Sequence, residues 1–136
     1  MSILKKGSSL SSEVKLTRSL EDYLEAVYIL QVEKGEARMK DLAARLNVKA
    51  SSANEAVEKL AERNLVKHER YGTITLTKEG EDLAKRIYNR HRILLKFLHE
   101  VLGVELDTAE EDSCALEHSI SEETLNKLVK FIERLG

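Results

Sequence analysis

Apolar residues recur every three or four positions along most of the chain, which is the spacing of helices that bury one face. The first such stretch lies between Ser19, which can cap a helix N-terminus, and Gly35, which can end one. Its apolar side consists of Leu20, Leu24, Val27, Tyr28 and Leu30. The pattern predicts a helix that ends near Lys34. Residues 1–16, rich in Ser and Lys, are predicted to form a flexible arm.

Shorter elements follow this helix. The segment MKDLAARL predicts a short helix ending at Leu46, and SANEAVEKLAERN predicts another, capped by Ser51 or Ser52. Between them lies a three-residue break, Asn47-Val48-Lys49. Residues 65–69 and 73–77 each include β-branched and apolar side chains. These segments predict two strands joined by a turn at Tyr71-Gly72. Helix, helix, break, helix and hairpin is the order of a winged helix-turn-helix.

The rest of the chain has a helical pattern only. A long helix is predicted from Thr77 as its cap to about Leu102, followed by Gly103 as a terminator. Another is predicted to start at Asp107 or Thr108, and the last at Ser119 or Ser121, with an apolar stripe of Leu125, Leu128, Val129 and Ile132. The expected fold is mainly α: a winged helix-turn-helix with a two-stranded wing at 17–77, then an all-helical domain at 78–136.

Composition restricts the class of protein. A chain of 136 residues, 42% hydrophobic and 34% charged, is typical of one globular domain or two small ones. No apolar run approaches the roughly 18 residues that a membrane span needs, and the N-terminus lacks the apolar core of a signal peptide. The single Cys excludes an internal disulfide and fits a reducing compartment. We therefore predict a cytoplasmic protein with no membrane partner.

The net charge of −2 conceals two opposite halves. From Arg38 to Lys78 nine Lys and Arg residues face five Asp and Glu, whereas from His99 to Asn126 nine acidic residues stand without any Lys or Arg. This segregation favours an anionic partner for the first half and cations for the second. A solvated helical surface with patchy charge is the alternative for either half taken alone.

The winged helix-turn-helix predicts binding to double-stranded operator DNA. The helix after the break would lie in a major groove, and positive side chains of the wing would meet phosphates. Candidate contacts near the bases are Lys49, Ser51, Ser52, Asn54 and Glu55. Candidate backbone contacts are Arg38, Lys40, Lys67, Arg70 and Tyr71. A small helical domain whose second helix only packs on other elements is the alternative.

The stretch CALEH places Cys114, Glu117 and His118 on one face within a single helical turn. Asp22 and Glu25, three residues apart, share a face of the first helix. Thiolate, carboxylate and imidazole are all metal-ligand types. Each residue also has an ordinary explanation when taken singly: a carboxylate near a helix N-terminus, a surface histidine, a small buried thiol.

Taken together, DYLEAVYIL, NRHRILLKFL and EEDSCALEHSISEE resemble the diphtheria toxin repressor/manganese transport regulator family. The resemblance covers about Thr17 to Leu135 and implies a homodimeric, metal-activated transcriptional repressor, with residues 78–136 as the metal-binding and dimerisation domain. Longer relatives carry an SH3-like domain, so the resemblance is to a short form without it.

The resemblance also implies the ligands. Asp22 and Glu25 match the acidic pair of the manganese-responsive branch, and His91 matches the histidine of the second metal position. Glu117 and His118 match ligands of both branches, whereas Cys114 matches the iron-responsive branch. Glu110 is a candidate for the second position. A thiolate with carboxylates favours Fe(II) or Mn(II), with Co(II), Ni(II) or Zn(II) able to bind in vitro.

Other functions are weighed against this one. A winged-helix regulator that responds to a small organic ligand, or to oxidation of the Cys114 thiol, would bind DNA without metal. A hydrolase using the Cys and His of CALEH lacks a visible oxyanion loop, so no enzyme activity and no small-molecule substrate are expected. A purely structural dimer module leaves the opposite charges of the two halves unexplained.

Overall fold

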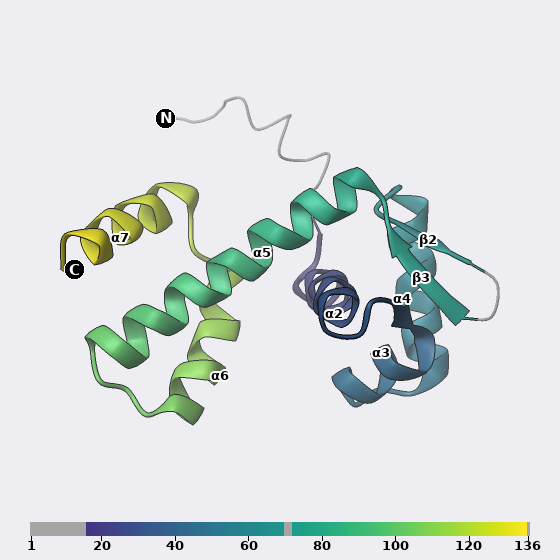
Figure 1. Ribbon diagram of the computed structural model, residues 1–136, viewed down its shortest axis with the longest axis horizontal. Helices are drawn as coiled ribbons and strands as arrows, with labels where there is room; N and C mark the ends of the chain where they lie inside the picture. The colour runs from purple at the N-terminus through teal and green to yellow at the C-terminus, as the bar shows by residue number, and fades with distance from the viewer. Residues whose placement is uncertain (1–15, 70–71, 136) are drawn as a thin grey trace.

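The computed structural model describes residues 16–69 and 72–135, and within them the chain is mainly α-helical (Figure 1). Predicted positions outside these ranges are most of the N-terminal arm, Arg70 and Tyr71. The elements in order are α2 (Arg18–Lys34), β1 (Ala37–Arg38), α3 (Met39–Leu46), α4 (Ala50–Glu62), β2 (Val66–His68), β3 (Thr73–Leu76), α5 (Lys78–Lys96), the π-helix η2 (Phe97–Val101), α6 (Leu106–Glu117) and α7 (Glu122–Leu135).

Helix α2 is the central element of the N-terminal half. Its cap is Thr17, whose Oγ1 accepts a hydrogen bond from the Leu20 backbone N–H at 3.2 Å, so the prediction of Ser19 as cap was wrong. Gly35 ends the helix as predicted, in the left-handed region at φ 84°, which favours glycine. The helix buries more than one side, through Leu20, Tyr23, Leu24, Ala26, Val27 and Leu30.

The order of a winged helix-turn-helix is confirmed. The turn between α3 and α4 is closed by Asn47 in the left-handed conformation, φ 55°. Helix α4 begins at Ala50, with Lys49 as a cap that makes no side-chain hydrogen bond, so Ser51 and Ser52 lie inside the first turn and do not cap it as predicted. The wing has a third strand that was not predicted: β1 pairs with β3, giving the antiparallel order β1-β3-β2.

Helix α5 starts at its predicted cap, where Thr77 Oγ1 accepts a hydrogen bond from the Gly80 N–H at 3.0 Å. Gly80 is required there, because a Cβ at this position would lie 1.9 Å from the Leu65 carbonyl oxygen. The predicted helix to Leu102 is α-helical only to Lys96 and continues as η2. Helix α6 begins at Leu106, one residue before the earlier of its two predicted starts. The start of α7 fits the prediction, because Ser121 Oγ accepts a hydrogen bond from the Thr124 N–H.

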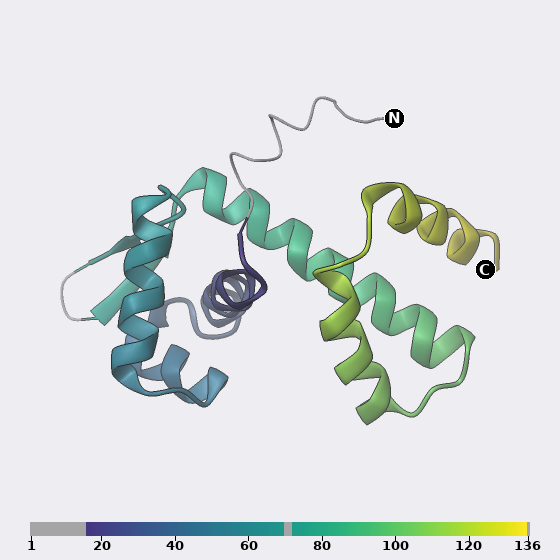
Figure 2. The same cartoon turned by 180° about the vertical axis from the view of Figure 1, so that it is seen from behind.

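Helix α5 crosses the middle of the molecule and joins its two halves (Figure 1). Seen from behind, α2 lies between α4 and the middle of α5, while α6 packs on the other half of α5 and α7 lies at that same end of the molecule (Figure 2). Both α2 and α6 pack on α5. Because α2 and α6 both pack on α5, residues near positions 22 and 117 lie next to each other although almost a hundred residues separate them in the sequence.

Helix α7 is much less buried than the other α-helices. Leu125 is its one buried residue, Leu128, Val129 and Ile132 are half-buried, and Phe131 stays 44% exposed with its ring against that of Phe97. Within residues 16–69 and 72–135, no helix combines the length and apolarity that a membrane crossing requires.

Candidate metal centre and nucleic-acid interface

Three helices supply the residues of the predicted metal site. Asp22 and Glu25 come from the first two turns of α2, His91 from the middle of α5, and Cys114 and Glu117 from the last turns of α6. His118 is the C-cap of α6. The structure brings all six together, and it also places Glu110 of α6 beside His91.

The His118 ring lies between two carboxylates of α2. Its Nε2 is 2.9 Å from Asp22 Oδ1 and its Nδ1 is 2.5 Å from Glu21 Oε1. The side chain is only 4% exposed. Both ring nitrogens of His118 are therefore directed at acidic groups of the first helix.

The His91 ring is held in a similar way between two carboxylates of α6. Its Nδ1 is 2.6 Å from Glu117 Oε1 and its Nε2 is 2.9 Å from Glu110 Oε1. These two contacts, the Glu117 hydrogen bond above all, raise the pKa of His91 to about 9, although burial acts in the opposite direction. Without metal, the ring therefore carries a proton at neutral pH.

Glu117 lies at the centre of the cluster. Its side chain is 1% exposed, and while it is ionised its Oε2 accepts no hydrogen bond from the described residues. Oxygen atoms of Asp22, Glu25 and Glu117 lie within 4.8 Å of one another. Burial, followed by the charge of Glu117 and a proton shared with it, raises the pKa of Glu25 to about 8. In the absence of a bound cation, the repulsion among these clustered carboxylates is therefore relieved by bound protons.

Cys114 completes a second group, with Asp22 and His118, whose ligand atoms also lie within 4.8 Å of one another. Burial raises the pKa of the Cys114 thiol, and the negative charges of Asp22 and Glu117 raise it further, while the Arg18 guanidinium acts in the opposite direction. A cation at this position would favour the thiolate, because it would reverse the electrostatic part of this shift.

A groove of about 550 Å³ gives access to the cluster, and Asp22, Glu25, His91, Glu110 and Cys114 are among the residues that line it. The donor atoms are carboxylate oxygens, imidazole nitrogens and a sulfur, which suit a divalent transition metal. Among the described residues, no group donates a hydrogen bond to the buried Oε2 of the ionised Glu117 carboxylate. A bound cation would satisfy such an atom. The residues present therefore fit a metal ion.

Two residues at this site were missed by the sequence analysis, Glu21 and Arg18. Glu21 stands one residue before Asp22 and four before Glu25, so these three carboxylates lie on adjacent parts of the α2 surface. That spacing was the available signal. Arg18 gave no signal, because its proximity to Cys114 depends on how α6 packs.

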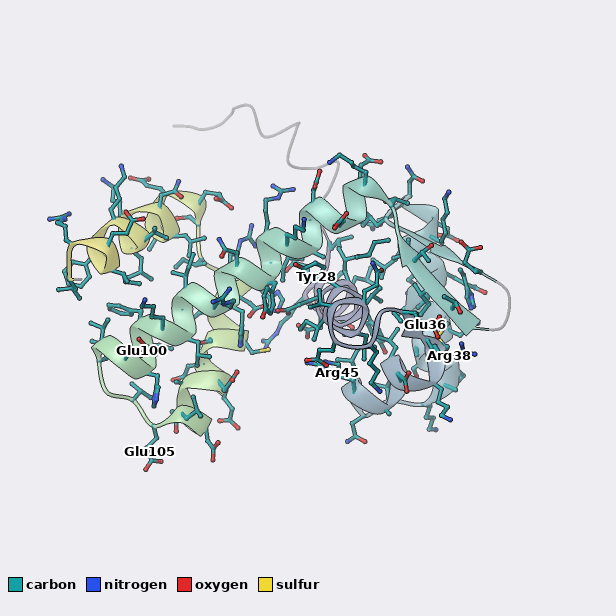
Figure 3. All side chains as sticks on the ribbon, in the orientation of Figure 1. Tyr28, Glu36, Arg38, Arg45, Glu100 and Glu105 are labelled. Carbon is teal, nitrogen blue, oxygen red and sulfur yellow. The ribbon has the colours of Figure 1, made fainter. Side chains whose placement is uncertain are left out.

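The predicted DNA-contacting residues lie mostly on open surface. Arg38 is beside Glu36, with Nη1 and Oε2 3.2 Å apart (Figure 3). Asn54 is half-buried, with its Nδ2 3.5 Å from Glu58 Oε2. Ser52 and Glu55 line a groove beside the start of α2. The remaining described candidates are exposed: Lys40, Lys49, Ser51 and Lys67.

Known proteins resemble the chain over both halves. Residues 15–74 match the family described as iron dependent repressor, N-terminal DNA binding domain, and residues 77–136 match its metal binding and dimerisation domain. An uncharacterised HTH-type transcriptional regulator of Methanocaldococcus jannaschii is 38% identical, over 88% of this chain and 96% of its own length. The HTH-type transcriptional regulator MntR of Bacillus pumilus is 37% identical, over 86% of this chain and 83% of its own.

A solved structure agrees with these sequence relatives. A manganese-dependent transcriptional repressor in complex with manganese superimposes with a TM-score of 0.71 at 36% identity, over 80% of this chain. The chain covers 50% of that protein's length. Since the two family matches together account for residues 15–74 and 77–136, the chain belongs to the iron-dependent repressor family.

Proposed function

We propose that the protein is a metal-responsive transcriptional regulator that represses genes of metal-ion homeostasis. The observation that carries this proposal is the position of the buried Glu117 carboxylate. It has an oxygen within 4.8 Å of carboxylate oxygens of Asp22 and Glu25, and its Oε1 contacts the His91 ring. Such a concentration of acidic groups is unfavourable without a cation. The function is binding rather than catalysis, and we infer a cytoplasmic location from the same role.

The residues that would hold the metal are Asp22, Glu25, His91, Cys114, Glu117 and His118, with Glu110 available for a second ion. A bound divalent ion supplies positive charge that offsets the repulsion among the carboxylates and favours the Cys114 thiolate. Carboxylates with a single thiolate favour Fe(II) or Mn(II). The metal named for relatives, iron for the family and manganese for one solved structure, supports this choice.

Helix α2 is the element through which the site would affect DNA binding. It carries Asp22 and Glu25 at one end, and at the other it is tied to α3 by two ion pairs, Glu33–Arg45 at 3.5 Å and Lys34–Asp41 at 3.7 Å. Repulsion between α2 and α6 in the metal-free protein would loosen the angle between α2 and the dimerisation helices. Neutralisation would favour one angle, and thereby one position of α3 and α4.

The DNA-binding and dimerisation roles are proposed for separate regions, residues 17–77 and 78–136. The start of α4 would enter the major groove, with Lys49, Ser51, Ser52, Asn54 and Glu55 near the bases and Arg38, Lys40, Lys67 and Arg70 near phosphates. A homodimer would place two such helices at half-sites roughly 34 Å apart on one face of the duplex. Exposed apolar residues of α7 are available to a second copy.

The test is a metal titration of DNA binding under anaerobic conditions. A duplex selected from a random library with the Mn(II)-loaded protein serves as operator, and Mn(II), Fe(II), Co(II) and Zn(II) are added in turn. We expect binding only with metal, and its loss in His118→Ala. Glu111→Gln is the matched control, since Glu111 is exposed on α6 and outside the cluster. Equal DNA binding with and without metal would contradict the proposal.

A further inference from the structure

Glu21 contacts His118 but belongs to neither of the two groups of described residues whose ligand atoms gather within 4.8 Å. We propose that Glu21 is a positioning residue for the metal centre: it accepts a hydrogen bond from the Nδ1–H of His118 and thereby directs Nε2 at the metal. This inference rests on the proposed function, and it adds a residue that is not a ligand.

The geometry distinguishes the two nitrogens of His118. Nε2 is 2.9 Å from Asp22 Oδ1 and 3.6 Å from Glu117 Oε2, so it faces the carboxylate cluster. Nδ1 is 2.5 Å from Glu21 Oε1, on the opposite edge of the ring. Only Nε2 thus faces two carboxylates that are proposed ligands.

Imidazole chemistry assigns the roles. A neutral imidazole has one N–H donor and one lone pair, and a ligating histidine commonly donates its other N–H to a carboxylate or carbonyl. A hydrogen bond from Nδ1–H to Glu21 leaves the lone pair on Nε2, which is the form able to bind metal there. Since the side chains of His118 and Glu21 are 4% and 14% exposed, water competes little for this hydrogen bond.

The contact also crosses between helices. Glu21 lies in the first turn of α2, and His118 follows the last residue of α6, 97 positions later. Fixing the ring before metal arrives lowers the entropy cost of ordering it on binding. Loss of Glu21 would therefore weaken metal binding without removing any ligand.

The test uses Zn(II), which is diamagnetic, with the full chain and three variants: Glu21→Ala, Glu21→Gln and the control Glu111→Gln. Affinity is measured by competition with a chelator. We expect Glu21→Ala to lose about 10- to 100-fold, as outer hydrogen-bond partners of ligating histidines typically do. Glu21→Gln keeps an acceptor oxygen and should retain most of the affinity, and Glu111→Gln should match the unchanged protein.

A second measurement separates positioning from a merely structural role. In ¹⁵N spectra of the Zn(II)-loaded protein, His118 should carry its proton on Nδ1, and Glu21→Gln should preserve this tautomer. Metal bound through Nδ1, or equal losses of affinity in Glu21→Gln and Glu21→Ala, would overturn the inference. So would a Glu21→Ala protein that melts at a lower temperature yet binds zinc unchanged. If the unchanged protein bound no metal, the proposed function itself would fail.

Discussion

The Glu117 carboxylate lies between the two histidines of the site, with one oxygen directed at each ring. Oε1 is 2.6 Å from His91 Nδ1, and Oε2 is 3.6 Å from His118 Nε2. In the metal-free protein this arrangement retains protons, on His91 and between Glu25 and Glu117. A metal ion must displace those protons, so affinity for metal should rise with pH.

The same protons make the stability of the metal-free protein depend on pH. The pKa of Glu25 rises from 4.5 to about 8 and that of His91 from 6.5 to about 9 on folding. Folding therefore takes up protons, and the stability it gains from them is lost as pH rises through these values. We expect the free energy of unfolding in chelator to fall between pH 6.5 and about 9. Urea unfolding measures it, and Glu25→Gln should reduce the fall. Stability that rose over this range would contradict the assignment.

Cys114 should determine which metals bind well. A thiolate favours softer or borderline ions such as Zn(II) and Co(II), whereas a hydroxyl does not. Cys114→Ser should therefore lower the affinity for Zn(II) and Co(II) more than that for Mn(II), measured by chelator competition. Ser at position 114 is close to Cys in size, so the melting temperature of the metal-free protein is the control for folding. An equal loss for all three metals would indicate that the thiol is not a ligand.

How much of the site the sequence predicts depends on the separation of its residues. Cys114, Glu117 and His118 share a helical turn, and the period of the α-helix alone places them together. That the same turn meets Asp22 and Glu25 came only from the resemblance to a known family. The Glu21–His118 contact was not predicted, since it depends on how α2 and α6 lie on α5.

At the scale of elements, the types and order of helices and strands were predictable, but several boundaries were not. Thr17 and Ser19 are both good cap residues, and the choice between them depends on where the buried side of α2 meets the core. Strand β1 is two residues long, too short to show a pattern, and exists because Ala37 and Arg38 pair with β3. Short elements formed by tertiary pairing leave little trace in the sequence.

At Gly80, the first turn of α5 lies close against the backbone that precedes β2. A Cβ there would lie 1.9 Å from the carbonyl oxygen of Leu65, a backbone atom that cannot move aside without shifting the chain before β2. Gly80→Ala should destabilise the protein by about 1–3 kcal/mol, although alanine is the better helix former. Thermal unfolding measures this. Arg86→Ala, at an exposed position of the same helix, is the control, and an unchanged or higher melting temperature for Gly80→Ala would contradict the close approach.

At the scale of the whole molecule, the opposite charges of the two halves separate DNA binding from metal binding. Lys67 is exposed on β2, in the wing. If it contacts phosphate in each subunit of a dimer, Lys67→Ala should reduce the slope of log affinity against log salt by about 0.9 per contact, close to 1.8 in all. The loss should be similar on any duplex sequence. Lys127→Ala on α7 is the control, and an unchanged slope for Lys67→Ala would exclude the phosphate contact.

Coupling between the halves has a thermodynamic consequence that needs no knowledge of the path. If metal tightens DNA binding by some factor, DNA must tighten metal binding by the same factor, and couplings of this kind are typically about 1–3 kcal/mol. We expect the Mn(II) affinity measured with saturating operator to exceed that of the free protein by the factor seen when DNA affinity is measured with and without Mn(II). Arg45→Ala, which removes the ion pair between α2 and α3, should reduce both factors together while leaving the metal ligands intact. Unequal factors would mean that a third state, such as a change of oligomer, takes part; equal factors unaffected by Arg45→Ala would place the coupling elsewhere than in this contact.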